Sequence, residues 1–351
     1  MATTSTTNEV TAASRTPVRK RGCLSIIGRG VKWTLIIAIA LGLLGVGYQT
    51  IASARDREAY SPRGQLYNVN GHQMHLICMG EGAPTVILQG GASAESLWWY
   101  RVQHGLATST RVCAYDRPGM GWSETVSGMR DGVTIASELH ALLEVAQISP
   151  PYVMVGHSFG AVWARIYAAQ YPDQVTGVVL VDSTFLQPER FGNQSEFDQW
   201  KLFWGGIQIP LWMATQTGVT RLSAPGDFAK AGYPAELLPE LVALRAQNQV
   251  FDAYYAETIH AAAALREQAF AAKGLGSLPL MILWAGQSPS AIAQFSTLRD
   301  EMAAYSTDSM TRTIEGADHL SLLGNDTYAQ QVITAILEVV EAAKTNTPLT
   351  K

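Results

Sequence analysis

The amino-acid sequence predicts an α/β protein with a mostly parallel sheet flanked by helices, a helical insertion and an apolar N-terminal helix. Short apolar runs recur between turn signals at 65–69, 73–79, 85–88, 111–115, 152–155, 177–181, 278–284 and 310–314, and these are the candidate strands. Helix-length segments at 133–146, 161–170 and 328–343 separate most of the later runs. This alternation is typical of parallel strands joined by right-handed crossovers. A long apolar run near the N-terminus predicts one further helix outside the sheet.

The N-terminal region is expected to hold a tail and a membrane helix. Residues 1–30 are Thr/Ala-rich and then basic, without apolar periodicity, so we expect a disordered basic tail. A transmembrane helix is predicted at 31–50, because residues 31–49 are apolar apart from one charge at the edge. As a helix this run is roughly 28 Å long, enough to span a bilayer.

The charges around this helix predict its orientation. Basic residues precede it in excess, whereas segment 55–63 is mixed in sign. The positive-inside rule therefore leaves the N-terminus in the cytoplasm and the following domain outside it. Two outcomes remain open: a tethered domain, or one released by cleavage after Ala54 in Ala52-Ser53-Ala54. We expect the tether, because the segment before the apolar run is long for a cleaved signal.

Composition excludes several classes of function. The chain has 351 residues, 47% hydrophobic and 15% charged, with a formal net charge of −4. These values suit a sizeable core, and no basic, aromatic-interleaved stripe appears, so no nucleic-acid partner is expected. Cys23, Cys78 and Cys113 lack metal-ligand spacing, so no metal site is predicted. For Cys78 and Cys113, a disulfide and two small buried thiols both remain open.

Two segments, 62–186 and 277–345, are expected to form the α/β core. Its first two strands are separated only by Asn70-Gly71-His72, a short link that predicts an antiparallel hairpin at the sheet edge. The segment 187–276 has helical patterns without a convincing strand, and it is predicted to be a helical cap. We expect most of its large apolar side chains to pack in the protein interior and some to line a pocket. These side chains include Trp200, Phe203, Trp204, Trp212, Met213, Phe251, Tyr254 and Tyr255.

Ser158 is the candidate nucleophile. It lies in Gly156-His157-Ser158-Phe159-Gly160, which joins an apolar strand directly to a helix. Such a nucleophile elbow holds the serine in a strained turn, and its small flanking residues let strand and helix approach closely. The helix N-terminus also supplies backbone donors for developing negative charge.

A serine hydroxyl needs a base, and His319 is the candidate because it follows the last predicted strand. The orienting acid is less clear, since the loop after 278–284 holds no carboxylate before Asp300. Asp182, at the end of the run 177–181, is the better candidate, and its alternative is a local loop cap. Asp308 and Asp318 are the remaining alternatives for the acid.

An oxyanion hole requires backbone N–H groups aimed at the reacting carbonyl oxygen. The elbow supplies one from Phe159, and Gly91 or Ala92 is expected to supply the other, because Gly90-Gly91 follows a predicted strand. An ordinary Gly-Gly turn is the alternative interpretation of this segment.

Taken together, these motifs resemble the α/β-hydrolase family, and more narrowly its bacterial membrane-anchored members. The elbow, the preceding Pro151-Tyr152 and the sequence at 111–123, RVCAYDRPGMGWS, carry the resemblance. It implies an eight-stranded sheet, a cap inserted after the sixth strand and a cofactor-free Ser-His-acid site. The resemblance also implies that the strands of Cys78 and Cys113 are neighbours, which favours a disulfide. In this family, residues in the positions of Asp116 and Arg117 belong to a loop whose role is mainly structural. The sequence departs from the family at Gln89, which replaces the histidine that commonly precedes the oxyanion glycine. Some members of the family take their acid from after the sixth strand, where Asp182 lies.

The predicted function is hydrolysis of an ester-like bond in an apolar small molecule, through an acyl-enzyme on Ser158 with His319 as base and Asp182 as orienting acid. An acyltransferase or a peptidase with the same triad remains open, as does a membrane-anchored binding domain without turnover. Relatives with an aspartate nucleophile are disfavoured because Ser158 cannot form their ester intermediate. The expected partners are the small-molecule substrate and the membrane around the N-terminal helix.

Overall fold

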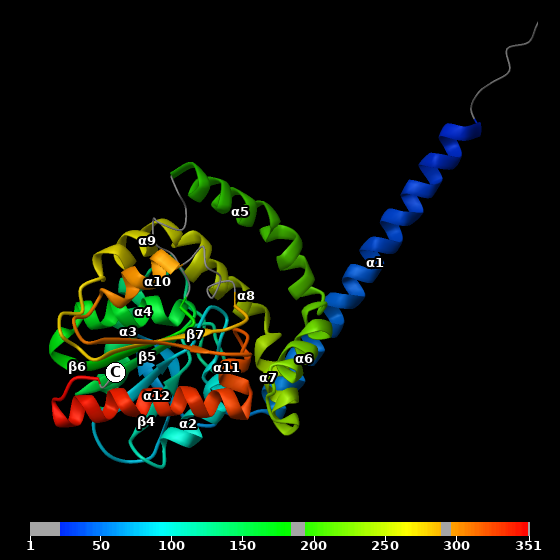
Figure 1. The fold of residues 1–351 in the computed structure, drawn as a ribbon. Coiled ribbons are helices and arrows are strands. Elements are labelled where there is room, and N and C mark those ends of the chain that lie inside the picture. Colours follow the sequence, from blue (N-terminus) through cyan, green and yellow to red (C-terminus); the bar gives the residue numbers. More distant parts are fainter. Residues whose placement is uncertain (1–21, 184–193, 289–295, 350–351) are drawn as a thin grey trace, which may run out of the picture.

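The computed structural model describes residues 22–183, 194–288 and 296–349 (Figure 1). Its centre is an eight-stranded sheet with the order β1-β2-β4-β3-β5-β6-β7-β8. The strands are β1 (Gln65–Val69), β2 (His72–Met79), β3 (Thr85–Gln89), β4 (Val112–Tyr115), β5 (Tyr152–His157), β6 (Val175–Val181), β7 (Leu280–Ala285) and β8 (Ser309–Ile314). β2 pairs antiparallel with β1 and β4, and the remaining pairs are parallel. The mostly parallel sheet with an antiparallel edge is therefore confirmed.

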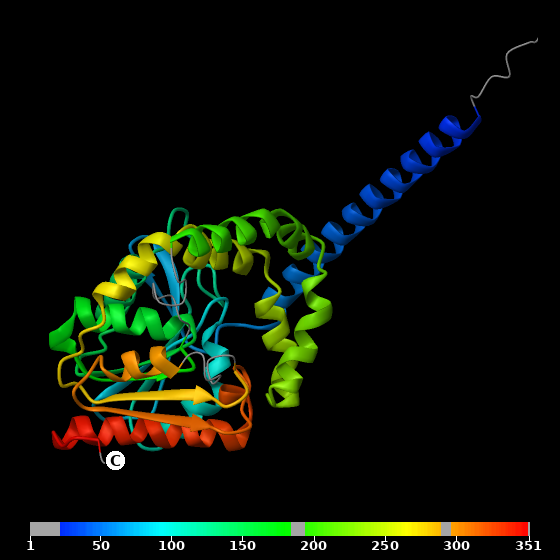
Figure 2. The same cartoon turned by 45° about the horizontal axis from the view of Figure 1, so that its top comes forward.

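Helices cover both faces of this sheet (Figure 2). One face packs on α3 (Gly132–Val145), α4 (Phe159–Gln170) and α10 (Ser296–Ala303), and the other on α2 (Tyr100–Leu106) and α12 (Asp326–Thr345). Short elements complete the core: η1 (Ser96–Trp99), η2 (Pro172–Gln174) and α11 (Ser321–Gly324). Strands β3, β4, β5 and β7 are buried along their whole length, because a parallel strand covered on both faces has no solvent side.

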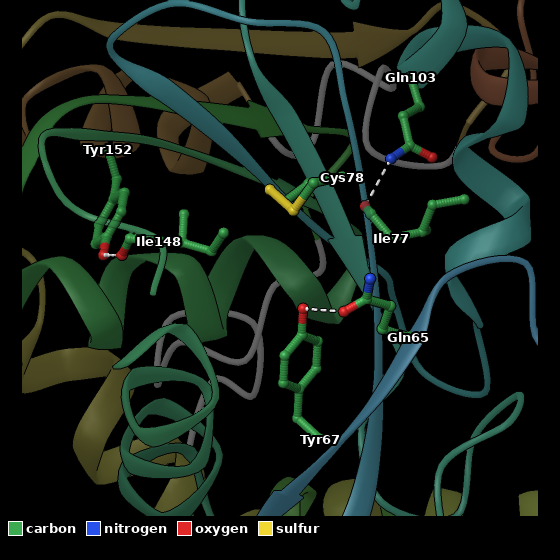
Figure 3. The surroundings of a disulfide bond; sticks show 8 residues. Gln65, Tyr67, Ile77, Cys78, Gln103, Ile148 and Tyr152 are labelled. Atoms are coloured by element: carbon green, nitrogen blue, oxygen red, sulfur yellow. Dashed lines mark hydrogen bonds between the residues drawn. A yellow bond between two sulfur atoms is a disulfide. The ribbon is translucent and has the colours of Figure 1, made fainter. Parts of the chain in front are cut away.

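Cys78 of β2 and Cys113 of β4 form a disulfide (Figure 3). The two residues are directly opposite each other in the antiparallel register of these strands. Of the two states left open by the sequence, the structure therefore contains the bonded one. The bond ties the antiparallel edge of the sheet to its parallel centre.

The cap lies between β6 and β7, after the sixth strand. Its helices are α5 (Gln194–Gln216), α6 (Thr220–Lys230), α7 (Leu238–Arg245), α8 (Asn248–Tyr255) and α9 (Ala262–Ala271), with the short elements η4 (Ala235–Leu237) and η5 (Ala256–His260). The described part of the predicted segment 187–276 contains no strand, and residues 187–193 lie outside the described residues.

Helix α1 (Gly22–Ala59) projects from the molecule (Figure 1). It is the one described helix long and apolar enough to cross a membrane, and only 6% of its most apolar stretch is buried. The helix is longer than the predicted 31–50, and residues 22–30, expected in the tail, are helical; residues 1–21 lie outside the described part of the chain. Its extension to Ala59 has a physical reason, since Gln49 and Asp56 bind the cap.

Candidate active site

Ser158 lies between β5 and α4, at the elbow predicted from the sequence. Its φ of 58° and ψ of −122° fall in a region that residues with a side chain rarely adopt. Glycines make the turn possible, because a Cβ at Gly156 would collide with the backbone of Gly160, and one at Gly160 with the backbone of Gln89. Ser158 N–H donates to the carbonyl of Val181 at 3.0 Å, which fixes the elbow beside the end of β6.

Asp182 and His319 form a direct pair next to this elbow. His319 Nδ1 is 2.5 Å from Asp182 Oδ2, and the donor is the ring N–H, because the buried carboxylate accepts. The Asp182 side chain is only 2% exposed, whereas the His319 side chain is 41% exposed. The acid is therefore buried behind a histidine ring that solvent reaches.

The loop after β7 holds Asp182 in place. The hydroxyl of Ser288 donates to Asp182 Oδ2 at 2.5 Å, and the N–H of Ala285 donates to Oδ1 at 3.2 Å. This is the loop in which the sequence shows no carboxylate. It supplies hydrogen-bond donors to the acid of the neighbouring strand instead.

His157, the residue before the nucleophile, supports the His319 loop. Its Nε2 lies 2.9 Å from the carbonyl of His319 and donates to it, and the two ring centroids are 4.3 Å apart. Burial, together with the neighbouring His319, lowers the pKa of His157 to about 3. The ring is therefore neutral at ordinary pH and acts as a fixed donor.

Arg117 holds the loop that follows β3. Its Nη1 and Nη2 donate to the carbonyls of Gly90 and Gly91 at 2.8 and 2.7 Å. In a planar trans peptide the N–H points opposite to the carbonyl, so the N–H groups of Gly91 and Ala92 are turned away from Arg117. A Cβ at Gly91 would lie 2.8 Å from Ser158 Cβ, so this loop touches the nucleophile itself.

The same arginine connects this loop to the cap. Its Nε lies 3.0 Å from Glu257 in η5, and its guanidinium packs 4.2 Å from the ring centroid of Trp163. Glu257 also lies 3.6 Å from Arg130, which pairs with Glu138 of α3. Arg117, Arg130 and Glu257 are all buried, so this network ties the loop, the cap and the core together.

Two cavities lie between the cap and the core. One, of about 250 Å³, is lined by Ser93 after the Gly90-Gly91 loop and by cap side chains including Trp204, Phe251, Tyr254 and Tyr255. The other, of about 200 Å³, reaches Leu320, which follows His319. Thr220 and Arg245 line both cavities, so the two adjoin at the cap. Four of the cap aromatics named from the sequence therefore line the first cavity. Trp204 is half-buried on α5, and the other three lie on α8.

The two other carboxylates considered from the sequence have different partners. Asp308 accepts from the N–H of Leu349 at 3.0 Å, near the C-terminus. Asp318 caps the following turn, because its Oδ1 accepts from the N–H groups of Leu320 and Ser321. In the described ranges, no group of three or more His, Cys, Asp or Glu side chains is arranged to hold a metal ion.

Ser288 and the bridging role of Arg117 are not evident from the sequence. Ser288 shows no motif, since serine is common in loops and its partner Asp182 is far away in the chain. For Arg117, the adjoining motif at 111–123 indicated a structured loop, but it gave no link to Gly90 and Gly91.

An eight-stranded sheet of this order, a strained serine between strand and helix, and an aspartate–histidine pair at the following strand ends define the class of α/β hydrolases. The family model described as "alpha/beta hydrolase fold" matches residues 84–326, and the chain belongs to this family.

Solved structures share this fold at low sequence identity. A putative acyltransferase from Salmonella enterica matches with a TM-score of 0.63 and 19% identity, over 80% of this chain and 98% of that chain. A putative lipase from Acinetobacter baumannii matches with a TM-score of 0.61 and 21% identity, over 85% and 97%.

Several curated proteins match over part of the chain. An uncharacterized protein of Schizosaccharomyces pombe is 31% identical in an alignment of 183 residues that covers 44% of this chain and 34% of that protein. A 1-acylglycerol-3-phosphate O-acyltransferase of Arabidopsis thaliana is 28% identical over 142 residues, 39% of this chain and 34% of that protein. The chain spans about a third of the length of these relatives.

Proposed function

We propose that this protein is a membrane-anchored serine hydrolase that cleaves carboxylic esters of apolar small molecules. The observation that carries the proposal is the hydrogen bond between His319 and the buried Asp182, made beside the strained Ser158. A histidine oriented in this way by a carboxylate is the base that a serine hydroxyl needs.

The chemistry follows from the tautomer of His319. Because Nδ1–H donates to Asp182, Nε2 carries the lone pair and takes the proton of Ser158 Oγ as this oxygen attacks the ester carbonyl. The resulting oxyanion accepts from the N–H of Phe159, which as the first residue of α4 has no partner within the helix, and from Gly91 or Ala92. His319 then protonates the leaving alcohol, and water releases the acyl group by the same steps in reverse roles.

The cap supports an apolar substrate. The larger cavity is lined mainly by aromatic and aliphatic side chains and begins at Ser93, next to the loop that touches Ser158. Binding sites for apolar molecules have this composition, with a few polar groups that orient the ligand.

The membrane anchor and its orientation are part of the proposal. Helix α1 is exposed and apolar along its outer part, and basic residues precede it. The disulfide between Cys78 and Cys113 supports a domain outside the cytoplasm, where such bonds persist. A protease that degrades the domain only after cell lysis would contradict this orientation.

Labelling with a fluorophosphonate probe tests the nucleophile. We expect the full-length protein to be labelled and Ser158→Ala to remain unlabelled, whereas Ser127→Ala, at an exposed serine away from the elbow, retains full labelling. A folded wild-type protein without labelling would instead indicate a binding domain without turnover.

A series of p-nitrophenyl esters of increasing acyl length tests the substrate class. We expect a preference for apolar acyl groups, lost in Ser158→Ala. The similarity to the putative acyltransferase from Salmonella enterica and to the acyltransferase from Arabidopsis thaliana makes the acceptor worth testing. Product analysis with an added alcohol distinguishes transfer, in which a new ester accumulates, from hydrolysis, in which the free acid forms.

A further inference from the structure

Helix α5 presents large apolar side chains to solvent. We call the following set the cap face: Leu202, Phe203, Ile209, Trp212 and Met213 of α5, with Val219 just before α6 and Leu222 in the first turn of α6. All of them are exposed, from 44% for Trp212 to 81% for Leu222. No charged residue lies between Lys201 and Arg221. Soluble proteins rarely expose so many neighbouring apolar groups to water, so an exposed set of this size indicates a surface that contacts a partner.

The cap face follows the geometry of the helix. Leu202, Ile209 and Met213 are separated by seven and four residues, so they form one stripe along α5. The opposite side of the helix carries buried or half-buried groups such as Phe197 and Trp204, which pack against the rest of the cap. The helix thus has two apolar sides, one packed and one exposed.

The end of α5 and the start of α6 adjoin the membrane helix. Gly45 of α1 lies against Thr217, because a Cβ at Gly45 would be 2.9 Å from Thr217 Cβ. One turn further on, Gln49 Nε2 donates to the carbonyl of Ala246 at 2.7 Å, and Arg221 Nε donates to Gln49 Oε1 at 2.7 Å. Arg221 also pairs with Asp56 at 2.7 Å. The carboxyl end of α5 is therefore fixed to α1 at the end of its apolar run.

This junction sets the depth of the cap face. Gly45 is inside the segment 31–50, so its contact with Thr217 lies within about 8 Å of the end of that segment along the helix. Amphipathic helices in the interface bury their apolar side by about 5–10 Å, and tryptophan is enriched at this level. In both views α5 extends away from α1 instead of continuing along it (Figures 1 and 2).

The inner side of α5 lines the larger cavity. Trp204, Leu211, Ala214 and Thr215 contribute to its wall, and Leu211 is also 40% exposed. One helix thus separates the apolar exterior from the cavity that begins next to the Ser158 loop.

We propose that the cap face lies in the interfacial layer of the bilayer crossed by α1, and that apolar esters dissolved in this bilayer enter the cavity past α5. The entry route rests on the proposed function and the anchor. The membrane contact of the cap face is a separate statement that does not require catalysis. Lipid is the occupant that the fixed junction with α1 favours over a second protein molecule.

Labels on single cysteines test the membrane contact. In the full-length Cys23→Ser protein, the remaining native cysteines form the disulfide, so Phe203→Cys or Leu222→Cys adds one free thiol. An NBD label is attached, and the protein is reconstituted into phosphatidylcholine–phosphatidylglycerol vesicles with or without doxyl-labelled lipid. Phe270→Cys on α9 is the matched control, since Phe270 is 53% exposed and Phe203 is 60% exposed.

We expect doxyl lipid to quench the labels at 203 and 222 but not the label at 270. No quenching at 203 and 222 would overturn the proposal, and so would equal quenching at all three sites. Labels shielded from water but not quenched by lipid would indicate a second copy or another protein on the cap face, which also overturns it.

An activity measurement tests the entry route. Phe203→Asp with Leu222→Asp is expected to lower the hydrolysis of a long-chain p-nitrophenyl ester held in vesicles by about tenfold or more, without changing hydrolysis of a water-soluble short-chain ester. Equal loss on both esters, or no loss on either, would overturn the route. A wild-type protein that cleaves neither ester refutes the proposed function, while the quenching result still decides the membrane contact.

Discussion

The hydroxyl of Ser288 donates a hydrogen bond of 2.5 Å to Asp182 Oδ2, the same oxygen that accepts from His319. This contact joins the loop after β7, which lacks a carboxylate, to the carboxylate that follows β6. The acid of the proposed triad is thus held in place by the loop that follows the neighbouring strand.

We expect Asp182→Asn to lower kcat by about 10³–10⁴-fold, because the amide cannot hold the His319 tautomer that keeps Nε2 free. Ser288→Ala is expected to lower kcat by about tenfold with little change in KM, since it removes one hydrogen bond to a charged group. Steady-state kinetics with a p-nitrophenyl ester measures both effects. Asp308→Asn is the control, and its inactivation together with an active Asp182→Asn would refute the assignment.

Arg117→Lys should reduce kcat by about 10²-fold, because a single ammonium cannot hold the carbonyls of Gly90 and Gly91 together and the oxyanion donors lose their orientation. Arg117 acts as a positioning residue, so KM should change much less than kcat. Kinetics are compared with the thermal midpoint of unfolding. A lower midpoint with normal kcat in the remaining folded protein would mean a purely structural role.

Stability at acid pH should depend on His157. Burial lowers its pKa from the ordinary 6.5 to about 3, so the unfolded chain takes up a proton that the folded chain does not. Stability is lost as the pH falls from 6.5 towards 3, and His157→Gln should flatten this part of the profile while keeping a donor for the His319 carbonyl. Thermal midpoints across this range measure it. His140→Gln, at a half-buried histidine, is the control, and an unchanged slope in His157→Gln would contradict the prediction.

Stability at alkaline pH should depend on Glu95. Burial and the nearby Asp116 raise the pKa of this carboxyl from 4.5 to about 8, although Arg245 acts in the opposite direction. A raised pKa contributes stability that is complete below 4.5 and is lost as the pH rises through 8. Glu95→Gln should therefore lose less stability than the wild type between about pH 5 and about pH 9. The exposed Glu81→Gln should follow the wild-type curve, and a Glu95→Gln curve identical to both would show that Glu95 does not titrate in this range.

Short-range sequence patterns predicted most of the fold. All eight apolar runs predicted as strands form strands, and the elbow at Ser158 has the strained geometry that its sequence requires. These features depend on neighbours in the chain, since strand periodicity, turn residues and the glycines around the nucleophile act over a few positions. The catalytic roles of Ser158, His319 and Asp182 remain predictions that the experiments above test.

The sequence by itself determined the fold family, the elbow and the apolar N-terminal helix, because each depends on short-range patterns of residue type. The tertiary structure decided which carboxylate contacts His319, how Ser288 and Arg117 fix the site, and how α1 joins the cap. These contacts link residues such as Asp182 and His319, which are 137 positions apart. Only the packing of the sheet and cap brings such groups together, and residue identity does not specify which distant partner each will meet.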